Sequence, residues 1–241
     1  MTAKEARQEQ WNKLKDQPLS AKLKYIFTYY WGAIALSVFA LIFATSWIVG
    51  ALTQKEVVLS GSIINSIALD SYQDNIAEIF LAEQQFDSEE YTFDLLDDVL
   101  FNATDISAVE HIATRIYTGD LDFIVADLEA YTLLSAYFAD LETVLTKEQL
   151  EKYRPYFVYV ERDALETLEQ GDQGSGLVFP KYYLDDAELE DPIALGICIP
   201  KTSCLFEAYA FPDEEIILGF TETNRHVPAT IAFLEFLFRQ Q

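Results

Sequence analysis

The feature that most constrains this chain is a run of 30 residues, between Lys24 and Lys55, in which no side chain is charged. The centre of the run, from Trp31 to Leu52, has 22 residues, of which only three carry a hydroxyl group. At about 1.5 Å per residue, a helix of this length crosses the ~30 Å hydrocarbon layer of a bilayer. The sequence therefore predicts a single transmembrane helix over residues 25–52.

Aromatic residues mark both ends of this apolar run. Tyr25, Tyr29, Tyr30 and Trp31 cluster at its beginning, and Trp47 lies near its end. Tyr and Trp are enriched at the level of the lipid headgroups, where their rings are partly apolar and partly wet. Their placement supports a span between two membrane interfaces.

The charges that flank the span predict its orientation. Residues 1–24 carry six basic and three acidic residues. Because Lys and Arg resist translocation, we expect a cytoplasmic tail over 1–24 and an extracellular domain over 53–241, held at the cell membrane. A cleaved signal peptide, with Val49-Gly50-Ala51 as a small-residue cleavage site, is the alternative. The apolar part of a signal peptide usually has about 7–15 residues, so the longer run favours a retained anchor.

The charge balance excludes one class of partner. Subtracting the +3 of the tail from the chain's formal net charge of −24 leaves −27 for residues 25–241. Nucleic-acid binding depends on Lys and Arg that neutralise phosphates, so it is excluded. The acidic surface fits a cationic ligand, Ca²⁺ or a basic partner, or serves solubility alone.

Strand and helix patterns alternate after the anchor. The β-branched run Val57–Ile64 predicts a buried strand, and Asp70 opens a helical pattern that includes Tyr72 and Ile76. Further strands are predicted over 91–96 and 121–126, and further helices over 104–117, which ends at Gly119, and 129–137. This order predicts an α/β fold with βαβ units and a parallel sheet.

The second half of the domain is less regular. Thr146 and Gln149 form a predicted capping box for a helix over 145–153. Strands are predicted over 156–160, 193–199 and 215–221. A final helix begins at Pro228, a favoured residue of the first turn, and its apolar composition predicts that it packs on the sheet.

Two segments resemble bacterial extracellular solute-binding proteins. Gly119–Leu141 (GDLDFIVADLEAYTLLSAYFADL) is similar to the family's segment in which Gly-x-x-Asp leads into a strand that ends at the ligand cleft. Ala139-Asp140-Leu141 resembles the turn to the next helix, and Ile216–Thr223 with Pro228–Phe238 resembles the family's later strand and helix. The resemblance covers residues 57–241.

The resemblance implies a periplasmic-binding-protein-like α/β domain of the type II class. It also implies a membrane-anchored, solute-binding-like accessory protein that works beside a transporter and binds an unknown small solute. The chain is shorter than a full member of the family, and its loop Asn65–Asp70 lacks a Gly-rich phosphate cradle. A non-catalytic interaction subunit with a vestigial cleft is the alternative, and small residues in the span allow close helix contact, namely Gly32, Ala33, Ala35 and Ala40.

Polar residues that follow the predicted strands are the candidate ligand-binding residues. Ligands of open α/β sheets lie at the carboxyl ends of the strands. This rule selects Asn65, Ser66, Asp97, Asp98, Asp127, Thr202, Ser203, Asn224 and Arg225. A role in turns is the alternative for each residue, because Asn, Asp and Ser favour turns for local reasons.

Cys198 and Cys204 are the only cysteines, and they predict either a short disulfide loop or buried free thiols. Neither cysteine has a second ligand at metal-binding spacing, so no metal site and no cofactor are expected. His111 and Arg115 are four residues apart on one helical face, and His226 is expected to cap a helix or lie at the surface. No nucleophile or paired-carboxylate motif is present, so we expect no enzyme activity.

Overall fold

The computed structural model describes residues 18–52, 54–69, 75–101, 106–169, 181–187, 189–213 and 215–239. The chain divides into two compact units, Met1–Gln54 and Lys55–Gln241, of which the second is called the C-terminal domain below. Most of the basic tail, the predicted helix start at Asp70 and Tyr72, and the Gly-rich loop at 170–176 lie outside the described residues.

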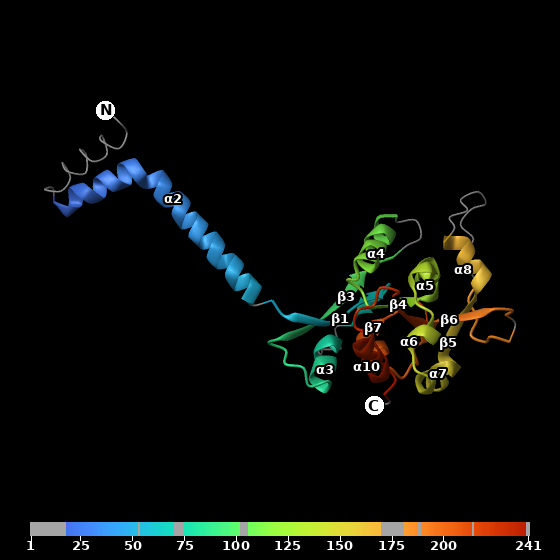
Figure 1. Cartoon of the computed structure of the whole chain (residues 1–241). Helices are drawn as coiled ribbons and strands as arrows, with labels where there is room; N and C mark the ends of the chain where they lie inside the picture. The colour runs from blue at the N-terminus through green and yellow to red at the C-terminus, as the bar shows by residue number, and fades with distance from the viewer. Residues whose placement is uncertain are drawn as a thin grey trace. The chain divides into compact units, whose positions relative to one another are not determined.

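The first unit is built on one helix, α2 (Leu19–Leu52), of 34 residues (Figure 1). Its segment Tyr30–Gly50 has a mean hydropathy of 2.2 and is long and apolar enough to cross a membrane. The hydroxyls of Ser37 and Thr45 donate to backbone carbonyls four residues earlier, at 2.9 and 2.8 Å. These bonds satisfy two of the three hydroxyl groups of the apolar run within the helix itself. The predicted helix is confirmed, and it begins six residues before the predicted span.

The C-terminal domain contains a six-stranded sheet. Its strands, in spatial order, are β3 (Tyr91–Val99), β1 (Glu56–Ile64), β4 (Phe123–Asp127), β8 (Ile216–Phe220), β6 (Pro192–Cys198) and β5 (Phe157–Glu161). β1 is parallel to β3 and β4, whereas the pairs β4–β8, β8–β6 and β6–β5 are antiparallel. The α/β class is confirmed, but the expected parallel sheet is limited to three strands.

The connections explain why the sheet is mixed. Parallel neighbours need a crossover of about a dozen residues or more, usually a helix. α3 (Ile76–Glu83) lies in the connection between the neighbours β1 and β3, and α4 (Ile106–Thr118) lies in the connection that leads from β3 to β4, on the other side of β1. Between β6 and β8 the described chain contains only α9 (Leu205–Ala208) and the two-residue strand β7 (Tyr209–Ala210). This connection contains no long crossover helix in its described residues, and β6 and β8 are antiparallel.

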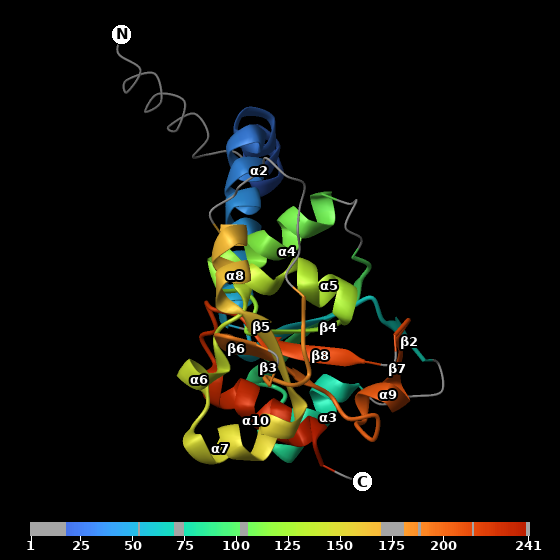
Figure 2. The same cartoon turned by 90° about the vertical axis from the view of Figure 1, so that its right-hand side faces the viewer.

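Helices cover both faces of the sheet (Figures 1 and 2). One face carries α3 (Ile76–Glu83), α7 (Lys147–Tyr153) and α10 (Val227–Leu237), and the other carries α4, α5 (Leu128–Leu133) and α8 (Arg162–Glu169). Short elements complete the described chain: β2 (Ile67–Ala68), η1 (Ser135–Tyr137), α6 (Leu141–Val144) and η2 (Arg154–Tyr156). Each face has its own apolar core cluster, and the domain is therefore an α/β/α sandwich.

Several local predictions are confirmed. Thr146 and Gln149 form the capping box of α7. Gly119 follows α4 with a φ of +69°, a left-handed conformation that glycine adopts at low cost. A proline lies in the first turn of α10. The predicted helix over 129–137 consists of α5 followed by the 3₁₀ turn η1.

A cluster of phenylalanines joins α10 to the sheet. The Phe233 ring centroid lies 5.4 Å from that of Phe80 on α3, 5.1 Å from Phe93 on β3 and 4.9 Å from Phe123 on β4. Phe233, Phe80 and Phe123 are fully buried. Aromatic pairs at such separations contribute about 0.5–1.5 kcal/mol each beyond the burial of their area. α10 therefore packs on the sheet, as the sequence predicts.

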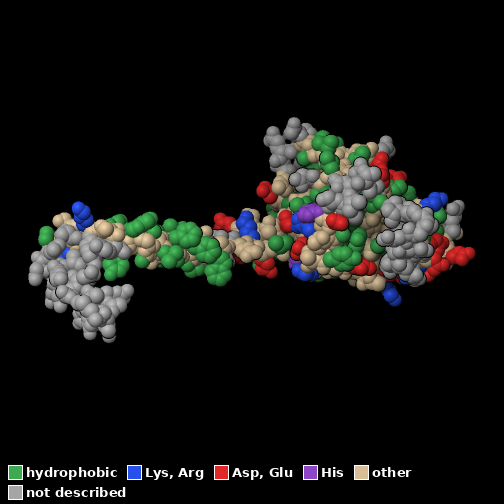
Figure 3. Space-filling view, turned by 90° about the horizontal axis from the view of Figure 1, so that it is seen from above, with side chains coloured by type: hydrophobic (Ala, Val, Ile, Leu, Met, Phe, Trp, Pro, Cys, Tyr) green, Lys and Arg blue, Asp and Glu red, His purple; other side chains and the backbone are tan. Residues whose placement is uncertain are grey.

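The surface composition differs between the two units. Hydrophobic side chains predominate along the exposed part of α2, whereas Asp and Glu side chains are distributed over the C-terminal domain (Figure 3). Large apolar side chains of α2 such as Trp31 and Trp47 are 65% and 73% exposed. Such exposure fits a helix that lies in a membrane or against a partner.

The substitution Gly61→Ala tests the packing of β1 on β4. A Cβ atom at Gly61 would lie 2.1 Å from the buried Phe123 ring, so the ring must shift. We expect the free energy of unfolding to fall by about 1–3 kcal/mol, as for other overpacked cores. The measurement is thermal unfolding of the full chain in detergent by far-UV circular dichroism. Gly32→Ala, where a Cβ meets nothing within 4 Å, is the control, and an unchanged midpoint for Gly61→Ala would contradict this packing.

Candidate functional site

Asn65 links the carboxyl ends of three neighbouring strands. It follows β1 with a φ of +56°, a left-handed conformation that Asn tolerates better than most residues. Its Nδ2 donates to Asp127 Oδ2 at 2.8 Å, and its Oδ1 accepts a hydrogen bond from the Phe101 backbone N–H at 2.7 Å. Asn65 thereby joins the end of β1 to the end of β4 and to the chain that leaves β3.

Asp127 is used on both of its oxygens. Besides the bond from Asn65, its Oδ1 accepts from the Ala130 backbone N–H at 2.8 Å and caps the first turn of α5. The residue is only 3% exposed. Asn65 and Asp127 lie together at the carboxyl ends of their strands, as predicted. Their hydrogen bonds are internal, however, and stabilise the fold.

The other candidates at this edge are also held by internal contacts. Asp97 accepts a hydrogen bond from the Tyr209 hydroxyl at 2.8 Å, and the Ser66 hydroxyl lies 3.4 Å from the Asp97 carbonyl. Tyr209 begins β7, which pairs with β2 directly after Ser66. The β2–β7 ribbon therefore ties the loop after β1 to the segment before β8. The side chain of Asp98 lies outside the described atoms.

Thr202 and Ser203 follow β6, whose carboxyl end lies at the same edge as those of β1 and β4. Thr202 is exposed in a turn. Ser203 is 1% exposed, its N–H donates to the Pro200 carbonyl at 2.9 Å, and its hydroxyl accepts from the Leu205 N–H at 3.4 Å. Ser203 thus shapes the turn that leads into α9.

Asn224 and Arg225 lie at the opposite edge of the sheet, so the expectation that they join the other candidates is wrong. β8 is antiparallel to β4, and its carboxyl end therefore lies beside the beginning of β4. Asn224 Oδ1 accepts from the His226 N–H at 2.8 Å. The Arg225 guanidinium donates to the Thr118 carbonyl at the end of α4. Both residues fasten helix ends at this edge.

Asp122 is the most densely bonded side chain of this second edge, and the sequence analysis did not select it. Its carboxylate accepts from the backbone N–H groups of Ser60 at 2.8 Å, Arg225 at 2.9 Å and His226 at 3.1 Å. The side chain is 2% exposed. Asp122 is the last residue of the Gly-x-x-Asp pattern, which was the one signal in the sequence that pointed to it.

His226 extends this network to the surface. Its Nδ1 lies 2.9 Å from Asp122 Oδ2, and since a carboxylate only accepts hydrogen bonds, Nδ1 carries a proton. His226 stands at the N-cap position of α10 without a side-chain capping bond. Ser60, the hydroxyl residue of the network, donates its hydroxyl to the Asp120 carbonyl at 2.6 Å. The hydrogen bonds of Asp122, His226 and Ser60 therefore hold β1, β4 and α10 together.

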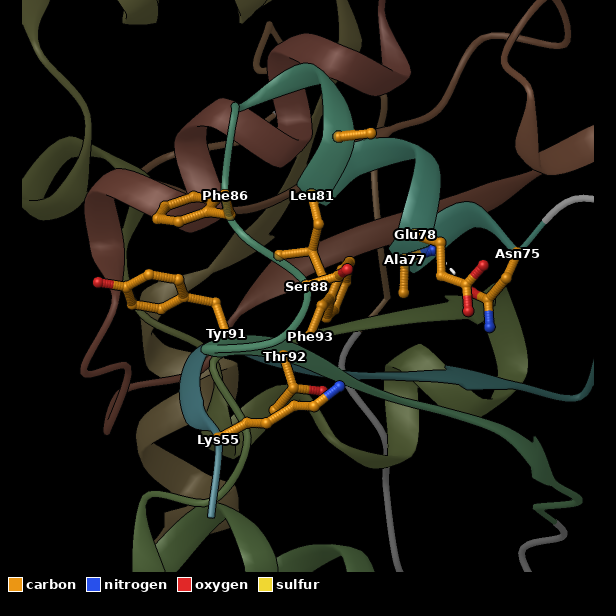
Figure 4. Close-up of a pocket in the computed structure, with 11 residues that line it drawn as sticks. Lys55, Asn75, Ala77, Glu78, Leu81, Phe86, Ser88, Tyr91, Thr92 and Phe93 are labelled. Atoms are coloured by element: carbon orange, nitrogen blue, oxygen red, sulfur yellow. Dashed lines mark hydrogen bonds between the residues drawn. The ribbon is translucent and has the colours of Figure 1, made fainter. Parts of the chain in front are cut away.

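A groove lies between α3 and β3, and it contains none of the predicted site residues (Figure 4). Its volume is about 460 Å³. Phe86 and Tyr91 lie at one end, and Asn75 and Glu78 lie at the other. We call it the α3–β3 groove. Its lining residues are Lys55, Asn75, Ala77, Glu78, Leu81, Ala82, Phe86, Ser88, Tyr91, Thr92 and Phe93. The sequence gives no sign of this groove because a helix and a strand from different patterns form it.

The two cysteines are free thiols, so of the two predicted states the structure contains the unbridged one. Burial raises the pKa of the Cys198 thiol, with a smaller contribution from the charge of Glu215. Burial raises the pKa of Cys204 to about 11. Both thiols are therefore protonated at neutral pH, the form that is the poorer nucleophile and metal ligand.

The remaining candidates do not form a reactive centre. His111 is exposed on α4, and Arg115, four residues later, pairs with Asp94 on β3 at 3.0 Å. Within the described part of the chain, no three His, Cys, Asp or Glu residues are grouped as a metal site would require.

The chain matches no protein-family model, no curated protein and no solved structure. Its place in a family therefore stays a prediction, and its function is argued below from its own residues.

Substitution of Asn65 separates a structural role from a ligand-binding role. Asn65→Ala removes two buried hydrogen bonds and places an alanine in a left-handed conformation, so we expect a loss of about 2–4 kcal/mol in unfolding free energy. Asn65→Gly should lose roughly 1 kcal/mol less, because glycine adopts this conformation freely. Thermal unfolding of the full chain in detergent measures both, with the exposed Thr202→Ala as control. A wild-type midpoint for Asn65→Ala would mean that the side chain does not hold the fold.

Proposed function

We propose that the chain is a membrane-anchored, non-catalytic interaction subunit of a membrane protein complex. The observation that carries this proposal is that the polar side chains at the carboxyl ends of β1, β3 and β4 are engaged in internal hydrogen bonds. Asn65, Asp97 and Asp127, the residues placed where a solute would bind, spend their polar groups on internal hydrogen bonds. A small-solute site needs polar groups that converge on the ligand and stay available to it.

A solute-binding-like accessory protein of the type II class is the second candidate. Its support is the order of elements, the apolar anchor helix and the gathering of Asn65, Ser66, Asp97 and Asp127 at one edge. A two-lobed protein of that class encloses its ligand between two separate sheets. In the described residues, the C-terminal domain has one six-stranded sheet and the two-stranded β2–β7 ribbon within one compact unit, and this favours the interaction subunit.

The short link after the anchor favours a partner in the same membrane. Three residues separate the end of α2 at Leu52 from the start of β1 at Glu56. Four Cα–Cα steps reach at most about 14 Å, whatever the angle between the two units. The beginning of β1 is thus held near the end of the span, where surfaces of other membrane proteins are within reach. A short tether gives no comparable advantage to a protein that captures freely diffusing solutes.

Orientation is part of the proposal and has its own test. With the basic tail in the cytosol, protease added to sealed right-side-out membrane vesicles should remove the C-terminal domain and leave a membrane-embedded fragment with an intact N-terminal tag. The same digestion after detergent permeabilisation should also remove the tag. Protection of the C-terminal domain until the vesicles are permeabilised would reverse the proposed orientation.

Native-gel migration of the full chain tests the interaction itself. At native expression level and in mild detergent, we expect the chain to migrate in an assembly larger than its own monomer or homo-oligomer. Migration as a monomer would contradict the proposal. A thermal-shift screen of the purified full chain against amino acids, sugars and short peptides provides the counter-test. A ligand present at 100 times its dissociation constant adds about 2.7 kcal/mol, so a clear shift by a small solute would favour the second candidate.

A further inference from the structure

Strand β3 forms one edge of the six-stranded sheet, and no described strand pairs with its outer side. The α3–β3 groove runs beside it. We propose that this groove binds an extended, cationic segment of the partner protein, which adds to β3 as a further strand. This inference rests on the proposed function and names the surface and the chemistry through which the subunit would act.

The length and register of β3 suit strand addition. β3 has nine residues, and it pairs in parallel with β1 from Glu56–Tyr91 to Ile64–Val99. An edge strand presents unpaired backbone N–H and C=O groups, which are a template for another extended chain. Recognition of this kind takes its affinity from main-chain hydrogen bonds and its specificity from pockets for alternate side chains.

The side chains of β3 point to two different environments. Phe93 and Leu95 pack in the core cluster on the α3 side of the sheet. Asp94 points to the other side, where Arg115 of α4 pairs with it. Because side chains alternate along a strand, an added segment would place every second residue on the α3 side, and those beside Tyr91–Phe93 would lie over the groove.

The floor of the groove can accept an apolar side chain. Ala77, Leu81 and Phe93 are 5–6% exposed and form a buried apolar base. Phe86 and Tyr91 are half-buried and extend this base at one end (Figure 4). A volume of about 460 Å³ lies within the range of pockets that bind small ligands, so it holds a leucine-sized or aromatic anchor.

Charge complementarity selects a cationic occupant. Glu78 stands on the α3 wall of the groove, and the turn that leads into β3 carries the exposed residues Asp87, Glu89 and Glu90. Lys55 is the one basic residue among those that line the groove. Residues 25–54 carry no charge, so the domain contributes all of the −27 of residues 25–241. A segment with Lys or Arg beside an apolar anchor gains from this field, and a neutral or acidic segment does not.

The same charges argue against a second copy of this chain as the occupant. β3 carries Asp94 and Asp97, so pairing of β3 with β3 of another copy would bring carboxylates close together. Like charges directly opposite one another destabilise a strand pair. Acidic side chains on an edge strand therefore discourage self-association while they leave the edge open to a basic segment.

Defined peptides test the groove on the full chain in detergent. The probe is a fluorescein-labelled decapeptide of alternating Lys and Val with one central Leu, and its binding is followed by fluorescence anisotropy. We expect saturable binding that weakens as salt is raised, because exposed charges are screened. N-methylation of alternate backbone nitrogens should weaken binding at least tenfold, and replacement of all Lys by Glu should abolish it. Equal binding of the N-methylated and parent peptides, or no binding of the parent peptide, would overturn strand addition.

Matched charge reversals locate the site. Glu78→Lys in the groove should weaken probe binding about three- to tenfold. Glu151→Lys, at another exposed helical position on α7, makes the same charge change elsewhere and should leave binding unchanged. An equal effect of the two variants would assign binding to the general acidity of the domain and overturn the groove. A doubled mass of the peptide-free chain that the Glu78→Lys variant abolishes would assign the groove to a second copy.

The inference and the proposed function fail separately. If Glu78→Lys loses probe binding but keeps the native assembly, the interaction subunit stands and its partner binds another surface. If the native chain is monomeric while the wild-type domain binds the probe at the groove, the groove stands and the proposed function falls. Loss of both probe binding and assembly in Glu78→Lys, with both retained in Glu151→Lys, supports the two together.

Discussion

The carboxylate of Asp122 is the interaction on which the arrangement of the C-terminal domain depends. It accepts from Ser60 on β1 and from the two residues that precede α10, and its own backbone bonds to Ser60 and Thr221. Hydrogen bonds to a charged group contribute about 1.5–3 kcal/mol each when they are buried. The start of β4, the end of β8 and the N-terminus of α10 are thereby held at one point. Once α10 is placed, Phe233 packs against the rings of Phe80 on α3, Phe93 on β3 and Phe123 on β4.

The two edges of the sheet are stabilised by the same means, and this affects function. Asp122 gathers backbone donors at one edge, and Asn65 and Asp127 join three strand ends at the other. Buried polar groups are stable only when their partners are satisfied, so a network that is complete without a ligand offers a ligand little. The binding surface that we propose lies instead beside β3, which has one described strand neighbour and, on its α3 side, the α3–β3 groove.

The sequence predicts local structure better than it predicts where distant segments lie relative to one another. The β-branched run of β1, the Thr146–Gln149 capping box and the left-handed Gly119 depend on neighbouring residues, and all three are confirmed. Strand direction depends on how the chain returns to the sheet, so the parallel sheet was wrong beyond β4 and Asn224 lies at the other edge. The role of Asp122 depends on donors from residues 60, 225 and 226, which no local pattern connects. The α3–β3 groove likewise appears only after two elements pack.

The tether, the acidic surface and the open edge restrict the same set of partners. A link of three residues keeps the beginning of β1 within about 14 Å of the end of the apolar helix, and Tyr91 at the start of β3 pairs with Glu56 at the start of β1. The edge strand therefore begins beside the strand end to which the link is attached. Basic residues are frequent beside membrane spans, where they set orientation, so a cationic segment is a common feature of membrane proteins at this level. Under the proposed function, an acidic edge strand and a short tether suit a partner in the same bilayer, and a soluble ligand would need neither of them.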